Sequence, residues 1–155
     1  MAGNKVEYLH ITNKDSIPQT APKKKNRKSL APQKQVVFLT SRIHPGETGA
    51  SWMIHGLIDT LVNPKDEDRE LVKNLKDNFE FYIIPMMNVD GVINGNYRCS
   101  LAACDLNRKW SKPSKSLHPG IYYTKKLCQS IVETEGKSFF MYLDFHGHSI
   151  KKNIF

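Results

Sequence analysis

The chain has 155 residues, of which 39% are hydrophobic and 25% are charged, and this composition is typical of one soluble globular domain rather than of a disordered chain. No segment approaches the run of about 18 apolar residues that a membrane span needs, and the amino-terminal residues lack the apolar stretch of a signal peptide. We therefore expect a cytoplasmic location. The net charge of +8 favours acidic partners, whether nucleic acid, an anionic membrane or an acidic protein tail.

The first part of the chain predicts strand, loop, strand and helix in that order. Weak alternation over residues 6–12 indicates a strand, and residues 13–34 follow as a long basic loop. The densest positive run of this loop, Lys23 to Lys28, favours a solvated segment, although a nuclear-import or nucleic-acid patch has the same pattern. Residues 35–40 are short, apolar and β-branched, which predicts a strand. Apolar residues at four-residue steps predict a helix over 48–62.

The second part continues the alternation of helices and strands. Acids at one end and lysines at the other indicate a helix over residues 66–76, and residues 79–85 predict a strand. Residues 86–118 are rich in Asn, Gly, Ser and Pro, and a loop of this length is usually functional. A helix over 119–135 and a strand over 138–145 complete the pattern. Strands that alternate with helices predict an α/β fold with right-handed crossovers.

Three cysteines, Cys99, Cys104 and Cys128, are odd in number and show no Cys-x-x-Cys spacing. Neither a disulfide framework nor a thiolate zinc site is indicated by this pattern. We expect all three to be reduced packing residues.

Two histidines and a glutamate stand at the ends of predicted strands. His44 and Glu47 flank a Pro-Gly pair directly after the strand at 35–40, and His146 ends the strand at 138–145. Pro and Gly supply a bend that lets the flanking side chains turn toward one point. In open α/β sheets, ligands gather outside the carboxyl ends of parallel strands. Two imidazoles and a carboxylate form a common ligand set of catalytic zinc, which leaves a fourth position for water.

His148 competes with His146 for the role of the third ligand. The two lie on the same run of chain, two residues apart, and side chains at this spacing rarely both reach one metal. The residues alone leave the choice between them open.

Five motifs occur in one order along the chain. They are His-Pro-Gly-Glu (44–47), Asn-Val-Asp-Gly-Val (88–92), Asn-Gly-Asn-Tyr-Arg (94–98), Asp-Leu-Asn-Arg-Lys-Trp (105–110) and Asp-Phe-His-Gly-His-Ser (144–149). With these motifs the chain resembles the zinc carboxypeptidases, and it is similar to their cytosolic, deglutamylase-like branch in particular. The resemblance implies an α/β fold with a mixed central sheet and helices on both faces, of which residues 1–155 would be the amino-terminal part of the catalytic domain.

The resemblance also implies a role for each motif residue. His44, Glu47 and His146 would bind one Zn²⁺ ion. Arg98 would polarise the scissile carbonyl as the catalytic arginine, and Asp105 would support a zinc-bound histidine. Asn107 and Arg108 would hold the terminal carboxylate of the substrate, since a guanidinium matches a carboxylate with paired donors.

The implied function is removal of carboxy-terminal residues, including glutamates, from peptides or proteins such as tubulin. Members of this family carry their general-base glutamate and a substrate-capping tyrosine beyond the last of the five motifs, so we expect the 155-residue chain alone to hydrolyse peptides poorly. The alternative is a non-catalytic basic zinc module that binds acidic tails. We expect no membrane partner, and no stacking platform or recognition helix supports binding to nucleic acid.

Overall fold

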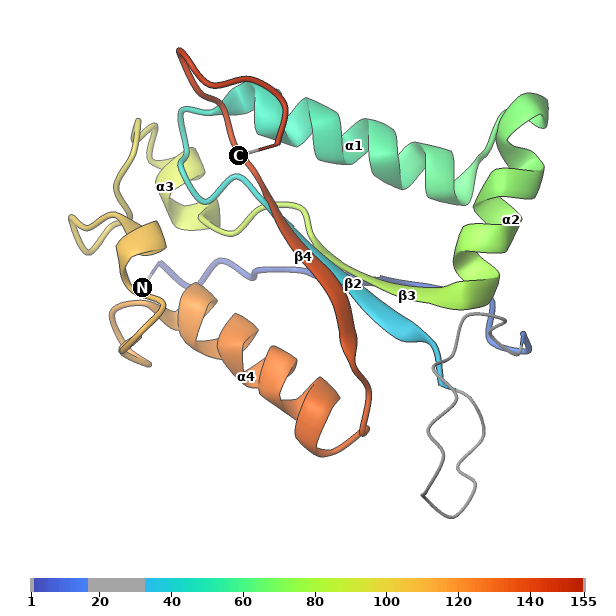
Figure 1. Ribbon diagram of the computed structural model, residues 1–155. Coiled ribbons are helices and arrows are strands. Elements are labelled where there is room, and N and C mark those ends of the chain that lie inside the picture. The colour runs from blue at the N-terminus through green and yellow to red at the C-terminus, as the bar shows by residue number, and fades with distance from the viewer. Residues whose placement is uncertain (1, 17–32, 155) are drawn as a thin grey trace.

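The computed structural model describes residues 2–16 and 33–154, and the basic run Lys23 to Lys28 lies outside these residues. Its helices and strands follow one another in the expected alternation (Figure 1). The elements are β1 (Leu9–Ile11), β2 (Gln35–Ser41), α1 (Thr48–Val62), η1 (Asp66–Asp68), α2 (Arg69–Asn78), β3 (Phe79–Ile84), α3 (Val89–Ile93), η2 (Leu106–Arg108), α4 (Pro119–Glu133) and β4 (Phe139–Phe145).

The strands form one mixed sheet in the order β1-β3-β2-β4. Strands β3 and β4 both run parallel to β2, whereas β1 pairs antiparallel with β3. In the β2–β4 ladder, Thr40 lies opposite Asp144 and Ser41 lies opposite Phe145. The three parallel strands therefore end at the same edge of the sheet, and this carboxyl edge is where a site is expected.

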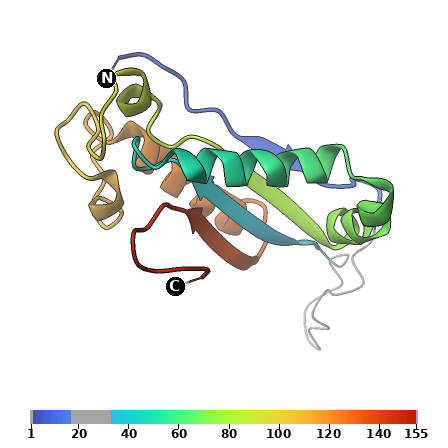
Figure 2. The same ribbon diagram turned by 90° about the horizontal axis from the view of Figure 1, so that it is seen from above.

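Helices cover both faces of the sheet, as Figures 1 and 2 show. Strand β2 explains why, because its side chains alternate between two apolar clusters. Val36 and Phe38 pack with residues of α4, including Ile121, in one cluster. Val37 and Leu39 pack with residues of α1 and α2 in the other. The expected α/β fold with a mixed sheet and helices on both faces is confirmed.

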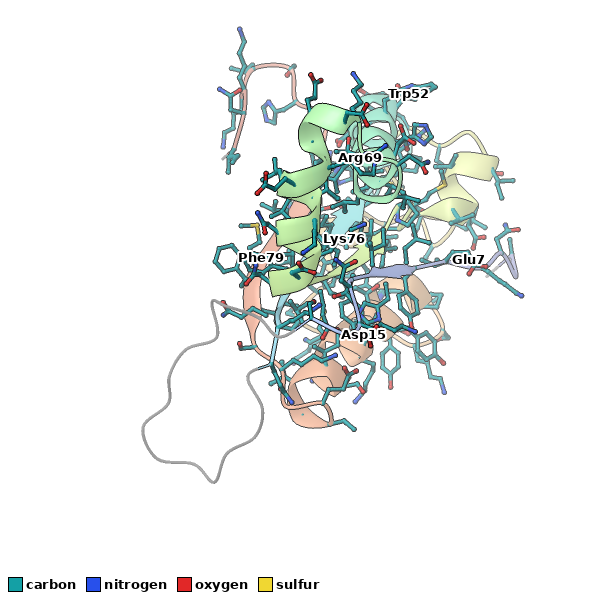
Figure 3. All side chains as sticks on the ribbon, turned by 90° about the vertical axis from the view of Figure 1, so that its right-hand side faces the viewer. Glu7, Asp15, Trp52, Arg69, Lys76 and Phe79 are labelled. Carbon is teal, nitrogen blue, oxygen red and sulfur yellow. The ribbon has the colours of Figure 1, made fainter. Side chains whose placement is uncertain are left out.

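Some element boundaries differ from those that the sequence predicts. The first strand spans only Leu9–Ile11, because these three residues are the ones that find partners on β3. The helix expected over residues 66–76 begins with the 3₁₀ turn η1, in which the N–H of Asp68 donates to the carbonyl of Lys65 at 2.9 Å. Figure 3 shows the α-helical part α2 with Arg69 and Lys76 along it.

The long segment 86–118 is not wholly irregular, since it contains the short helix α3 and the turn η2. The three cysteines are free. Within residues 2–16 and 33–154, no helix has the length and apolar character needed to cross a bilayer.

Candidate metal centre

Two histidines and a glutamate from separate parts of the chain meet at the carboxyl edge of the sheet. His44 lies in the turn after β2, Glu47 precedes α1 and His146 follows β4. Their ligand atoms all lie within 4.8 Å of one another. The Nδ1 atom of His44 is 2.8 Å from Glu47 Oε1, and the Nδ1 atom of His146 is 3.0 Å from Glu47 Oε2. The structure thus brings together all three ligands that the sequence predicts.

The outer nitrogen of each imidazole faces a carboxylate. His44 Nε2 lies 3.1 Å from Asp105 Oδ1, and His146 Nε2 lies 2.7 Å from Asp144 Oδ2. A carboxylate can only accept, so with a metal bound at the two Nδ1 atoms each pairing would hold the ring proton on Nε2 and leave the Nδ1 electron pair to the metal. Metal-bound histidines usually carry this kind of carboxylate partner. The donor set and its supports therefore fit a zinc ion.

The electrostatics of the cluster favour ionised carboxylates. Burial alone would raise the pKa of Glu47, but the hydrogen bond from the Gly147 N–H and the neighbouring histidines outweigh it, and the pKa lies below its usual value. The pKa of Asp105 is likewise lowered, because hydrogen bonds from His44, the Asn107 N–H and Arg98 outweigh the effect of burial. Ionised oxygens of this kind are the form that binds a metal.

The turn that carries His44 is held by contacts from distant segments. Asn88 donates from Nδ2 to the carbonyl of Ile43 at 3.1 Å, and the Gly46 N–H donates to the carbonyl of Tyr97 at 2.7 Å. A Cβ atom on Gly46 would lie 2.5 Å from the Tyr97 ring and 2.8 Å from its carbonyl oxygen. Glycine is therefore required here for close approach of two backbones.

Arg42, directly after β2, adopts the left-handed region with φ of 55°. Its guanidinium donates to the Pro45 carbonyl and to Ser51 Oγ, both at 2.7 Å. Left-handed backbone is uncommon for a residue with a side chain. These two bonds hold the strained residue where the chain bends from β2 toward His44.

Arg98, the predicted catalytic arginine, is drawn to the same cluster through Asp105. Its Nε and Nη2 atoms donate to Asp105 Oδ2 at 3.0 and 2.7 Å. Its side chain stays 47% exposed, so part of the guanidinium faces solvent beside the candidate metal centre. Asp105 consequently links His44 to Arg98.

The two residues predicted to clamp a substrate carboxylate lie in η2 next to the cluster. Asn107 Oδ1 accepts from Trp110 Nε1 at 2.9 Å, which turns the Asn107 amide nitrogen toward His146 Nε2, 3.4 Å away. The Arg108 side chain is exposed, and no hydrogen bond or ion pair holds it to another residue of the described chain.

His148 lies outside the cluster. It is exposed, and its Nδ1 atom accepts from the N–H groups of Ile150 and Lys151 at 3.1 and 3.0 Å. Of the two candidates for the third ligand, the structure brings His146 to His44 and Glu47.

Asp144 is the residue of this centre that the sequence reasoning missed. It precedes His146 by two positions, so the two side chains leave the strand on the same face. This Asp-x-His spacing at a strand end was a signal that could have found it. Its cross-strand neighbour Thr40 carries no such signal, because the pairing depends on the register between β2 and β4.

An α/β sheet with two imidazoles and a carboxylate at its carboxyl edge presents the donor set that zinc hydrolases use. Sequence comparison narrows this class: the chain belongs to the zinc carboxypeptidase family, whose model matches residues 1–150. The resemblance seen in the five motifs is thereby confirmed, and zinc is the metal of this family.

Named relatives and solved structures agree with this assignment. The chain is 44% identical over 155 residues to cytosolic carboxypeptidase 2 of Mus musculus, covering 100% of this chain and 16% of that protein. It is 48% identical over 119 residues to cytosolic carboxypeptidase 1 of Xenopus laevis, covering 77% of this chain and 9% of that protein.

Among solved structures, the metallo-carboxypeptidase from Burkholderia cenocepacia superposes with a TM-score of 0.72 at 28% identity, covering 92% of this chain and 33% of that one. A carboxypeptidase from Shewanella denitrificans superposes with a TM-score of 0.68 at 30% identity, covering 91% of this chain and 31% of that one. The chain therefore spans about a third of these structures.

Proposed function

We propose that this chain forms the metal-binding part of a zinc-dependent carboxypeptidase, with His44, Glu47 and His146 as the ligands of one zinc ion. The observation that carries the proposal is the convergence of three ligand atoms within 4.8 Å, with the outer nitrogen of each histidine held by a carboxylate. Membership of the family supports the same assignment.

When bound, zinc supplies a Lewis acid that activates water and polarises a carbonyl. The protein's own residues position the reactants around it. Asp105 orients His44 and at the same time anchors Arg98. The exposed part of the Arg98 guanidinium then donates to the oxygen of the scissile carbonyl, where negative charge develops. Removing one such donor typically lowers the rate by about 100- to 1000-fold.

Asn107 and Arg108 hold the free carboxylate at the end of the substrate. The amide of Asn107 is oriented by Trp110, and Arg108 is exposed. A guanidinium binds a carboxylate through two parallel hydrogen bonds. An enzyme with this clamp selects chains that end in a free carboxylate, which is what removal of a terminal residue requires.

The substrates that we propose are peptide or protein carboxyl termini, and in particular acidic tails or glutamate branches such as those of tubulin, in the cytoplasm. The relatives are named cytosolic carboxypeptidases. The net charge of +8 attracts an acidic chain over a distance that is screened to about 10 Å at 0.1 M salt. Binding of a glutamate-rich peptide should therefore weaken as salt is added.

Metal analysis of the purified protein tests the ligand set. We expect close to one zinc per chain, and we expect His44→Ala and His146→Ala each to lose it. His148→Ala serves as the matched control and should keep its zinc. Retention of zinc in both ligand variants would overturn the assignment, whereas loss in His148→Ala but not in His146→Ala would move the ligand by two positions.

Peptide binding tests the clamp separately from the metal. A glutamate-rich peptide with a free carboxyl terminus should bind more tightly than its amidated form, and Arg108→Ala should remove the difference. Lys115→Ala removes the same charge from an exposed position and should preserve it. Equal binding of both peptides to the unmutated protein would contradict the clamp and favour the alternative, a non-catalytic basic zinc module that binds acidic tails.

A further inference from the structure

A chain of hydrogen bonds runs across the β2–β4 ladder to His146. The hydroxyl groups of Tyr142 and Thr40 lie 2.9 Å apart. Thr40 Oγ1 donates to Asp144 Oδ1 at 2.8 Å, and Asp144 Oδ2 lies 2.7 Å from His146 Nε2. Thr40 itself is fully buried, with none of its surface exposed. The contact between Thr40 and Asp144 is therefore made inside the sheet.

The Asp144 carboxylate fixes the direction of every hydrogen bond in this series. The Asp144 carboxylate can only accept, so Thr40 must give it its single hydroxyl proton. Thr40 then accepts a hydrogen bond from the Tyr142 hydroxyl. Burial raises the pKa of Tyr142. A protonated phenol is the form that can donate. Both carboxylate oxygens of Asp144 are thus occupied, one by Thr40 and the other by His146 Nε2–H.

Asn107 cannot replace Asp144 in this role. Its amide oxygen already accepts from Trp110, so the group that faces His146 Nε2 at 3.4 Å is an NH₂ donor. Two donors do not bond to each other. The ring orientation of His146 is consequently set by Asp144, and the orientation of Asp144 is set by Thr40.

From this geometry we infer that Asp144 and Thr40 are positioning residues that keep the Nδ1 atom of His146 aimed at the metal. The inference rests on the proposed zinc site. It differs from the support of His44, because Asp105 belongs to a loop whereas Asp144 and Thr40 are paired residues of the sheet. A central strand thereby fixes a metal ligand that directly follows the neighbouring strand.

Zinc affinity, measured by competition with a chromophoric chelator, tests the inference. Asp144→Asn should weaken zinc binding by about 10- to 100-fold, which is the usual effect of removing such a partner. Thr40→Val should weaken it by about three- to tenfold, as expected for one lost hydrogen bond. Thr40→Ser keeps the hydroxyl and should bind zinc like the unmutated protein.

Ser41→Ala is the matched control, because Ser41 is adjacent, buried, and its hydroxyl has no hydrogen-bond partner. A second measurement is the visible absorption spectrum of the cobalt-substituted protein. It reports ligand geometry, and it should change in Asp144→Asn and stay constant in Ser41→Ala. Far-ultraviolet circular dichroism of the metal-free variants checks that each is folded. If Asp144→Asn does not fold, the contrast between Thr40→Val and Thr40→Ser decides.

The outcomes separate this inference from the proposed function. If His146→Ala binds zinc as tightly as the unmutated protein, the ligand assignment itself fails. If His146→Ala loses zinc while Asp144→Asn and Thr40→Val keep full affinity and an unchanged cobalt spectrum, the positioning role is wrong and the zinc site stands.

Discussion

The two edges of the sheet hold their charged groups in different ways. At the amino edge, internal cations pair with the carboxylates. Lys137, just before β4, lies 2.8 Å from Glu80 and 2.6 Å from Glu135, and Lys73 lies 2.7 Å from Asp77. Lysines of the protein itself neutralise these acids, so their charges need no bound cation.

Among the described residues, the carboxyl edge gathers more acids than cations. Glu47, Asp105 and Asp144 surround two imidazoles, and Arg98 is the cation of the cluster. With both imidazoles neutral, as zinc ligands are, three carboxylates and one guanidinium leave a net charge of −2, which a zinc ion would balance. Acceptors that converge in this way repel one another unless a cation lies between them. The amino edge thus holds ion pairs that stabilise the sheet, whereas the carboxyl edge holds the proposed metal site.

The largest effect that we expect is the response of folding stability to zinc. Free zinc at 100 times its dissociation constant should stabilise the protein by about 2.7 kcal/mol, because the metal binds the folded state. Thermal unfolding with zinc and with a chelator measures the difference. His146→Ala should show little of this gain, whereas a change at the amino edge such as Lys73→Met should leave it intact. An equal gain in all three proteins would break the contrast between the edges.

Gly46→Ala tests the carboxyl edge and should destabilise the protein. The added Cβ would lie 2.8 Å from the Tyr97 carbonyl oxygen, and this backbone atom can move only with its loop. We expect a loss toward the upper end of about 1–3 kcal/mol, measured by chemical denaturation. Gly49→Ala is the matched control, because nothing lies within 4 Å of its Cβ position, and alanine in helix α1 should be neutral or stabilising. Equal stability of both variants would show that the turn adapts freely.

Lys137→Met tests whether the amino edge depends on its internal cation. The side chains of Lys137 and Glu80 are 16% and 12% exposed, so loss of the ammonium leaves a largely buried carboxylate. His10 remains 2.8 Å from Glu80, and we therefore expect the lower part of a loss of about 1–3 kcal/mol. Lys73→Met, at an ion pair whose lysine is 70% exposed, should destabilise the protein less, because solvent screens an exposed ion pair. A larger loss in Lys73→Met than in Lys137→Met would reverse this ranking.

The smallest effect should appear in acid. Hydrogen bonds from Lys73 and Asn13 lower the pKa of Asp77 from 3.8 to about 2. A carboxyl whose pKa is depressed in the folded state stabilises that state above its unfolded pKa, and the contribution is lost as the pH falls from about 4 toward 2. A titration of the Asp77 carboxyl by NMR should show this low value. In Lys73→Met the midpoint should move upward, and an unmoved midpoint would assign the shift to Asn13.

Regular features of the fold follow from local patterns in the chain. The apolar run at residues 35–40 and the four-residue spacing within 48–62 predicted β2 and α1 closely, because burial on the sheet imposes those periods. The short β1 was overestimated, since its length depends on which residues find partners on β3. A cross-strand register is a tertiary property that no local pattern contains.

The site residues likewise differ in whether a local pattern could predict them. His44, Glu47 and His146 could be found because their residue types and strand-end positions carry the chemistry of a metal ligand. The hydrogen bonds between Arg98 and Asp105 could not be predicted, because they depend on how the segment 86–118 folds back on itself. The support that Thr40 gives to Asp144 likewise depends on a pairing across 104 positions.

That pairing also sets the order in which the protein can assemble. Contacts between β2 and β4 join residues far apart in the chain, and we expect them to form late, because closing a long loop is entropically unfavourable. His44 and Glu47 can approach each other early through the local turn, whereas His146 arrives only with β4. Tight zinc binding should thus begin only when β4 has paired with β2. The rate of zinc binding during refolding would therefore measure how fast the sheet is completed.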